Sequence, residues 1–242
     1  MSNLQTHIEN YLKYCEEQKR LDYKTLKAYK IDLSQFCQSI STNNLTDITS
    51  SMLENYISEL HQKYKPKTVK RKIASMKALF HYFEYREIID LNPFNKILIK
   101  FREPTSLPKT IPLNTVETIL STIYTKKATA KTTYQKRNAL RDAATIELLF
   151  ATGIRIFELC SLQIDDVNLE DGTILISGKG SKERRLQIRN IEVLNILKEY
   201  RLDFSKEIAN CGHFFANQSG HPLSDQTVRR IINKYTSLAS IS

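Results

Sequence analysis

The sequence predicts a mainly α-helical protein of two domains, with a small β-hairpin in the second. The 242 residues suffice for two modest domains, 41% of them are apolar, and only 6 glycines and 6 prolines interrupt the chain. Apolar residues recur at helical spacing over most of its length, and four prolines gather near the middle. We expect a helical domain at 1–92, a linker at 93–112 and a second domain at 113–242.

Four helices are expected in the first domain. Apolar stripes at helical spacing cover residues 8–15, 26–36, 53–60 and 69–83. Asp22 precedes the second stripe, Thr49 or Ser50 the third, and Pro66 begins the fourth, all of them residue types that favour helix starts. Four short helices of this kind form a compact bundle.

The linker and the second domain follow from a change of pattern. Pro93, Pro104, Pro108 and Pro112 lie in a stretch with little periodicity, which is typical of an extended linker. Helical patterns then cover residues 113–124, 139–152, 155–162, 191–200 and 225–238. Residues 173–177 and 184–188 alternate as strands do, and the glycine-containing turn between them predicts a hairpin.

Charge and cysteine usage limit the class of protein. Lys and Arg number 36 against 26 Asp and Glu, a formal charge of +10, and the excess is spread over both halves. A long polyanion such as double-stranded DNA would explain this distribution, and solubility alone is the alternative. Four scattered cysteines fit neither a disulfide framework nor a zinc site, so we expect a reduced, cytoplasmic protein, without signal segment or membrane span.

One expected helix separates basic from apolar residues. Its basic side carries Lys67, Lys70, Arg71 and Lys77. Three small residues share that side: Ala74, Ser75 and Ala78. Small side chains would let the helix approach a sugar-phosphate backbone, so we predict DNA contact here; an ordinary solvated face is the alternative.

A glycine and an arginine mark the junction of two expected helices. Gly153 is placed to end one helix in the left-handed conformation, and Arg155 begins the next. A guanidinium at such a turn is in a position to face a phosphate. A lone arginine there would more often be an ordinary surface residue.

Several segments together resemble the tyrosine recombinases. Residues 149–162, LFATGIRIFELCSL, resemble the first arginine motif of this family, and residues 178–184, GKGSKER, resemble its β-hairpin lysine motif. Residues 25–36 are similar to the core-binding domain of the Xer-like branch, and Asn92-Pro-Phe94 to its end. Residues 214–224 resemble the connection before the final catalytic box. The resemblance implies a four-helix, SAM-like core-binding domain followed by a catalytic domain.

The resemblance also implies roles for particular residues. Arg155 would hold the non-bridging oxygens of the scissile phosphate, and Lys179 would protonate the departing 5′ oxygen. Glu158 would help hold the arginine; an exposed helix residue or a structural ion pair is the alternative. Further DNA contacts are expected at Lys182, Arg184, Arg229 and Arg230. The family reaction is site-specific recombination through a 3′-phosphotyrosyl link, without metal or cofactor, by a homo- or hetero-tetramer on paired sites.

The sequence departs from the family in its last segment. The family ends with His-x-x-Arg, a His or Trp, and the nucleophilic tyrosine, but none of the five histidines has arginine three positions on. Tyr235 is the last tyrosine, and its apolar stripe predicts a core residue. We therefore expect a catalytic domain that is incomplete at its C-terminus and inactive as given. The alternative to a recombinase is a catalytically dead DNA-binding remnant or decoy.

Overall fold

The computed structural model describes residues 3–42, 44–99, 110–178 and 183–240. The chain divides into two compact units, Met1–Leu107 and Pro108–Ser242, each with its own hydrophobic core. Helices dominate both units, and a three-stranded sheet belongs to the second. The predicted fold class, mainly α with a small sheet, is confirmed.

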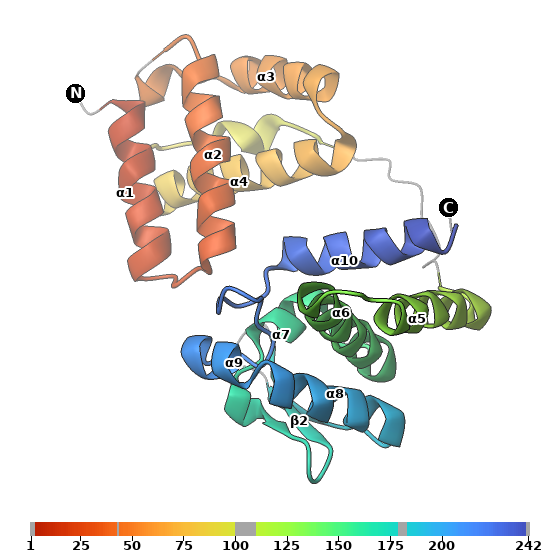
Figure 1. Ribbon diagram of the computed structural model, residues 1–242. Coiled ribbons are helices and arrows are strands. Elements are labelled where there is room, and N and C mark those ends of the chain that lie inside the picture. Colours follow the sequence, from red (N-terminus) through yellow and green to blue (C-terminus); the bar gives the residue numbers. More distant parts are fainter. Residues whose placement is uncertain (1–2, 43, 100–109, 179–182, 241–242) are drawn as a thin grey trace. The chain divides into compact units, whose positions relative to one another are not determined.

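Among its described residues, the first unit consists of four α-helices and two 3-10 helices (Figure 1). The α-helices are α1 (Leu4–Glu17), α2 (Tyr23–Ser39), α3 (Ser50–Lys63) and α4 (Pro66–Tyr85). The 3-10 helices are η1 (Leu45–Asp47) and η2 (Pro93–Lys96). Three predicted boundaries are confirmed: Asp22 and Thr49 cap α2 and α3 with their side chains, and Pro66 stands in the first turn of α4.

Helix α4 is the centre of the first unit, because it packs against α1, α2, α3 and η2. The ring of Phe80 lies 6.0 Å from that of Phe36 and 5.5 Å from that of Phe94. Phe94, which we expected in an extended linker, therefore belongs to this core. The Asn92 side chain accepts the Phe94 N–H at 3.0 Å and starts the 3-10 helix that carries Phe94 inward.

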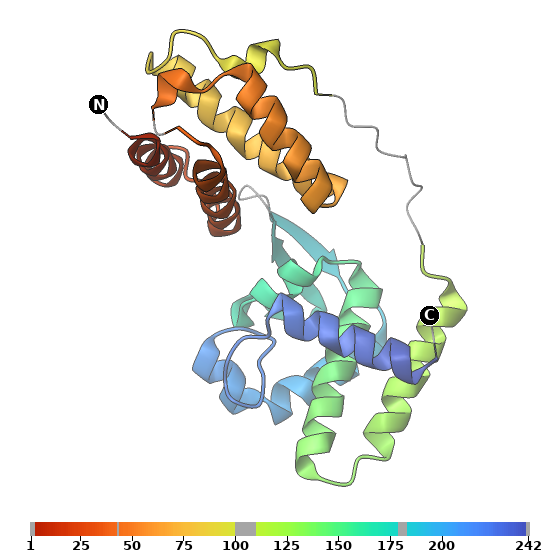
Figure 2. The same ribbon diagram turned by 90° about the horizontal axis from the view of Figure 1, so that it is seen from above.

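The second unit consists of six α-helices, one 3-10 helix and the sheet among its described residues (Figure 2). The helices are α5 (Leu113–Ala128), α6 (Thr133–Thr152), α7 (Ile156–Ser161), η3 (Ile164–Asp166), α8 (Ile191–Asp203), α9 (Ser205–Cys211) and α10 (Asp225–Leu238). Helix α6 contacts α5, α7, α8 and α10, and α10 lies across α5 and α6. A central helix of this kind sets the positions of the elements around it.

In this unit α6 starts earlier than predicted, α5 and α8 end later, and α9 was missed. Helix α6 begins at Thr133 rather than at residue 139, because Thr132 and Gln135 cap each other: the Gln135 N–H donates to Thr132 Oγ1 at 3.1 Å and the Thr132 N–H donates to Gln135 Oε1 at 3.4 Å. Helix α9 was not predicted, since its seven residues are too few to show a periodic stripe.

The sheet is antiparallel, in the order β1-β2-β3. Its strands are β1 (Val167–Asn168), β2 (Thr173–Ser177) and β3 (Glu183–Gln187). The predicted strand at 173–177 and its hairpin partner are confirmed, although β3 is shifted by one residue and β1 was missed. Arg184 lies opposite Ile176, and Arg185 lies opposite Leu175. Ile176 is fully buried, so Arg184 stands on the side of the hairpin that faces the core.

The turn between α6 and α7 has the predicted geometry. Gly153 has a φ of 62° and caps α6, with its N–H donating to the Leu149 carbonyl at 2.9 Å. Arg155 follows in extended conformation as the N-cap residue of α7. The left-handed glycine thus reverses the chain and delivers Arg155 to the beginning of a new helix.

Candidate active site

Two arginines converge on one buried carboxylate in the second unit. The Glu158 side chain is only 2% exposed. Its Oε1 accepts from Nη1 of Arg155 at 3.1 Å and from Nη1 of Arg184 at 2.9 Å. Its Oε2 accepts from the backbone N–H of Arg155 at 2.9 Å and from Nη2 of Arg184 at 2.8 Å. Both oxygens are therefore fully satisfied away from solvent.

The position of Glu158 in α7 explains its contact with Arg155. A glutamate three residues after the N-cap residue can reach back to that residue's N–H. Hydrogen bonds from Arg184, and secondarily from Arg155, lower the pKa of Glu158 to about 2, although burial acts in the opposite direction. The sequence left open whether Glu158 holds Arg155, forms a structural ion pair or is an exposed helix residue. In the structure Glu158 is buried and forms ion pairs with both Arg155 and Arg184.

Arg155 is the outward-facing member of this cluster. Its side chain is 79% exposed, and Glu158 accepts from only one of its side-chain nitrogens. The remaining donors of the planar guanidinium are available for a bidentate contact with a phosphate. Arg184 is 40% exposed and directs both terminal nitrogens at Glu158. A DNA contact by Arg184 stays a prediction, while its contact with Glu158 was not foreseen.

The two lysines predicted on the hairpin turn, Lys179 and Lys182, lie outside the described residues. The strands that precede and follow them, β2 and β3, are described. Their pairing runs from Thr173 opposite Gln187 to Ser177 opposite Glu183. Arg184 is thus the second paired residue of β3.

Helix α4 presents the predicted basic surface of the first unit. Lys67, Lys70 and Lys77 are exposed on it. The Arg71 side chain is 46% exposed, and its Nη1 donates to buried Asp32 of α2. The Arg71 guanidinium is thus paired with a buried carboxylate of the neighbouring helix.

One detail of this surface was predicted incorrectly, and one neighbouring lysine had no assigned role. Ser75, assigned to the basic side, is fully buried, and its hydroxyl donates to the Lys72 carbonyl at 2.8 Å. Lys72 is also buried, and its Nζ donates to Asp32 at 3.1 Å and lies 4.9 Å from the ring centre of Tyr64. Of the small residues, only Ala74 and the half-buried Ala78 remain at the surface.

Helix α10 carries two further predicted cations and one buried tyrosine. Arg229 and Arg230 are exposed. Tyr235 is fully buried, and its hydroxyl donates to Asp142 of α6 at 3.1 Å. Burial and the neighbouring Asp142 charge raise the pKa of Tyr235, which opposes the ionisation that a nucleophile needs. Tyr235 is the core residue that its apolar stripe predicted.

Asp142 joins α6 to α10 through several donors. Its side chain is 1% exposed and also accepts from Nζ of Lys234 at 3.0 Å and from Nη2 of Arg141 at 2.6 Å. The two donors from α10, Tyr235 and Lys234, link that helix to the buried carboxylate of α6. The orientation of α10, and with it that of Arg229 and Arg230, depends on this contact.

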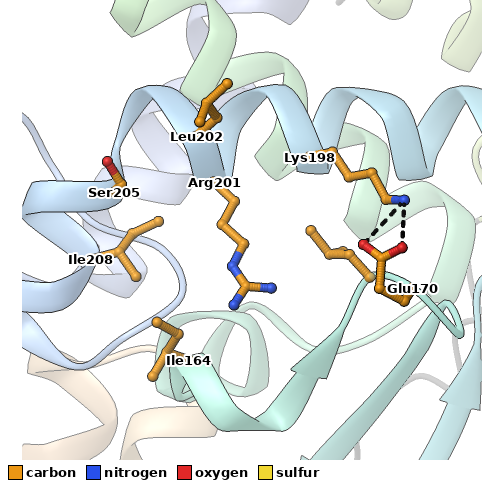
Figure 3. A pocket seen from close by; sticks show the side chains of 8 residues that line it. Ile164, Glu170, Lys198, Arg201, Leu202, Ser205 and Ile208 are labelled. Carbon is orange, nitrogen blue, oxygen red and sulfur yellow. Dashed lines mark hydrogen bonds and ion pairs between the residues drawn. The ribbon is translucent and has the colours of Figure 1, made fainter.

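A separate pocket of about 430 Å³ lies between α8, α9 and the segment around η3 and β1 (Figure 3). Arg201 extends from α8 toward the segment that contains Ile164, and Lys198 pairs with Glu170 at 3.4 Å. None of the described residues that line it is a predicted catalytic or DNA-contacting residue. The pocket is therefore distinct from the arginine cluster.

The fold and the cluster define a class of protein. A helical unit with a basic helix accompanies a unit in which an exposed arginine is anchored on a buried carboxylate, an arrangement suited to nucleic-acid phosphates. Within the described ranges there is no group of three or more His, Cys, Asp or Glu that could hold a metal ion. No described helix combines the length and apolar character needed to cross a membrane.

Comparison with known families identifies this class. Residues 110–242 match the Phage integrase family, and residues 8–87 match the Phage integrase N-terminal SAM-like domain. The chain belongs to the phage integrase family of tyrosine recombinases, enzymes of site-specific recombination that act on DNA. The recognition of this family from two short motifs is confirmed.

Relatives and solved structures agree with this assignment. A tyrosine recombinase of Agathobacter rectalis is 67% identical over 241 residues, covering 100% of this chain and 79% of the relative. The crystal structure of a lambda integrase tetramer bound to a Holliday junction is similar in fold, with TM-score 0.72, 18% identity, and 100% and 68% of the two chains covered. The crystal structure of XerH site-specific recombinase bound to difH substrate is also similar in fold, with TM-score 0.70 and 22% identity. The match covers 97% of this chain and 67% of the XerH chain.

Proposed function

We propose that this chain binds duplex DNA, engages a backbone phosphate with Arg155, and does not cleave DNA in the form given. The observation that carries the proposal is the exposed Arg155 guanidinium anchored on buried Glu158. Because Arg184 brings a second positive charge to the same carboxylate, the cluster keeps a net positive charge. A positively charged guanidinium that is held by one hydrogen bond is complementary to a phosphodiester.

The chemistry assigned to these residues is that of a phosphoryl transfer. Arg155 contacts the non-bridging oxygens and stabilises the charge that develops on them in the transition state. Lys179 donates a proton to the departing 5′ oxygen, which a lysine can do and an arginine essentially cannot. In the complete reaction a tyrosine oxygen attacks phosphorus, and the bond to the 5′ oxygen breaks as the 3′-phosphotyrosyl bond forms.

The lack of cleavage follows from the residues that are present. The sequence contains no His-x-x-Arg, so a second arginine from that motif does not share the phosphate charge. Tyr235, the last tyrosine of the sequence, is fully buried, and its hydroxyl donates to Asp142. We therefore expect this chain to bind DNA without cleaving it. A DNA-binding decoy or remnant stays the alternative to an active recombinase.

The assembly proposed for a catalytically complete member is a homo- or hetero-tetramer on paired sites. Its support is the lambda integrase tetramer that shares this fold. For this chain, we propose DNA binding through Lys67, Lys70, Arg71 and Lys77 in the first unit, and through Arg155, Lys179, Lys182, Arg229 and Arg230 in the second.

A pool of nicked suicide duplexes with randomised core sequence tests both parts of the proposal, DNA binding and the lack of cleavage. The chain should shift the duplexes on a native gel and leave no denaturation-resistant adduct. The Agathobacter rectalis relative, incubated with the same pool, serves as the control expected to form adducts. Failure of the chain to shift any duplex would contradict the binding half. An adduct that disappears on Tyr235→Phe would contradict the other half, because an internal tyrosine would then be the nucleophile.

A further inference from the structure

Arg184 reaches Glu158 because of its register in the hairpin. It lies opposite Ile176, whose side chain is fully buried, and Leu186 continues the same side of the strand. Arg185 lies opposite Leu175 and therefore stands on the other side of the sheet. The pairing of β2 with β3 thus sends the guanidinium of Arg184, and not that of Arg185, toward α7.

The two arginines divide their hydrogen bonds differently. Arg184 uses both terminal nitrogens on the two oxygens of Glu158, at 2.9 and 2.8 Å. Arg155 uses one side-chain nitrogen, at 3.1 Å, and its side chain is 79% exposed. A bidentate guanidinium–carboxylate pair fixes both partners in one plane. Arg184 therefore holds the carboxylate, and Arg155 presents its remaining donors to solvent.

Without Arg184, Glu158 would be a poor anchor for Arg155. A single ion pair to a largely exposed arginine is weakly held, because water competes for the guanidinium and its side chain keeps conformational freedom. The Glu158 carboxylate would also neutralise the Arg155 charge. With Arg184 in place the cluster retains one positive charge, and each carboxylate oxygen accepts a hydrogen bond from Arg184.

We infer that Arg184 is a positioning residue: by locking the Glu158 carboxylate it fixes the exposed guanidinium of Arg155 for a DNA phosphate and ties the α6–α7 turn to the β2–β3 hairpin. This role rests on the proposed phosphate contact of Arg155. It differs from a direct DNA contact by Arg184, because a positioning residue acts only through Arg155.

A double-mutant cycle on binding to a random-sequence duplex separates the two roles. We expect Arg155→Gln and Arg184→Gln each to weaken binding by about tenfold, the size of one charge-assisted contact. The double variant should bind within about twofold of Arg155→Gln, since nothing remains to be positioned. Arg185→Gln is the matched control: it removes one positive charge from the adjacent position, and its effect should multiply with that of Arg155→Gln.

A second measurement needs no DNA. Relaxation of the Arg155 Nε–H group by NMR should report an ordered guanidinium in the unmodified chain and in Arg185→Gln, and a mobile one in Arg184→Gln. Arg184→Lys should give intermediate mobility, because one ammonium cannot make the bidentate pair. Circular dichroism establishes that each variant is folded. If Arg184→Gln does not fold, the mobility of Arg155 in Arg184→Lys decides whether Arg184 orders it.

The outcomes distinguish this inference from the proposed function. Multiplying losses in the Arg155/Arg184 double variant, or an Arg155 group equally ordered without Arg184, would overturn the positioning role. If the unmodified chain binds no duplex, the proposed function fails, and the NMR comparison still decides whether Arg184 orders Arg155.

Discussion

The Glu158 carboxylate accepts four hydrogen bonds from two arginines, although its side chain is 2% exposed. Its pKa of about 2 in the folded chain lies below the ordinary value of 4.5. The ionised form is thus favoured by folding, so the stability it contributes is fully present above about pH 4.5. That contribution is lost as the pH falls through 4.5 toward 2.

We predict a pH-dependent stability difference between the unmodified chain and Glu158→Gln. Their free energies of unfolding should differ most above pH 4.5, and the gap should shrink by on the order of 3 kcal/mol toward pH 2. Denaturant titrations followed by circular dichroism at several pH values measure this. Glu170→Gln, which removes an exposed partner of Lys198, should cost less than about 1 kcal/mol throughout. A gap for Glu158→Gln that stays constant with pH would show that the carboxylate is not specifically stabilised.

Single residues were predictable where local chemistry decides their position. The left-handed Gly153 and the exposed Arg155 follow from the short turn itself. Partners distant in sequence were not predictable, although signals existed. Lys72 lies at helical spacing from Val69 and Met76, so a lysine on an apolar stripe indicated a buried acid, which the structure identifies as Asp32. Arg184 alternates with Leu186 and Ile188, which indicated an inward-facing cation.

At the scale of elements, the α6–α7 turn depends on a glycine. Gly153 has a φ of 62°, and a Cβ added there would meet nothing within 4 Å. The cost of Gly153→Ala is therefore conformational, about 1–2 kcal/mol in the free energy of unfolding, and Gly153→Asn should cost less. Gly172→Ala should cost more, because its φ is 67° and its Cβ would lie 2.6 Å from the Ile188 carbonyl oxygen. Equal losses at the two glycines, measured by thermal unfolding, would contradict this assignment.

The basic side of α4 is predicted to contact phosphates on any sequence. Lys67→Gln, Lys70→Gln and Lys77→Gln together leave the Arg71–Asp32 pair intact. The slope of log K against log salt for duplex binding should fall by about 0.9 for each phosphate that the variant no longer neutralises, similarly on unrelated sequences. A charge-matched triple elsewhere in the first unit, Lys13→Gln, Lys19→Gln and Lys63→Gln, should change that slope less. Equal effects of the two triples would mean that α4 is an ordinary solvated face.

Helix and strand predictions succeeded where a repeat was long. All four helices of the first unit and the hairpin of the second follow apolar periodicity. The errors have physical causes. A polar capping box starts α6 before its apolar stripe begins. Helix α9, with seven residues, and strand β1, with two, are too short to show a periodic pattern. Phe94 was assigned to the linker because the prolines of that stretch suggested an extended segment, but its side chain belongs to the core of the first unit.

At the scale of the whole molecule, positive charge is present on both units. The sequence carries 18 basic and 12 acidic residues through Thr110, and 18 and 14 after it. Each unit has its own core and its own candidate contacts, α4 in one and the arginine cluster with α10 in the other. A polyanion that meets both units releases counterions from each, so binding should depend steeply on salt.

The salt dependence of duplex binding by the unmodified chain and by Arg155→Gln tests the central claim most directly. We predict that log K for the unmodified chain falls linearly and steeply with log salt, because several phosphates are contacted. The Arg155→Gln variant should remain folded and bind more weakly, with a slope shallower by about 0.9, the value for one phosphate contact. A binding constant that hardly changes with salt, or a slope that Arg155→Gln leaves unchanged, would contradict a phosphate contact by Arg155.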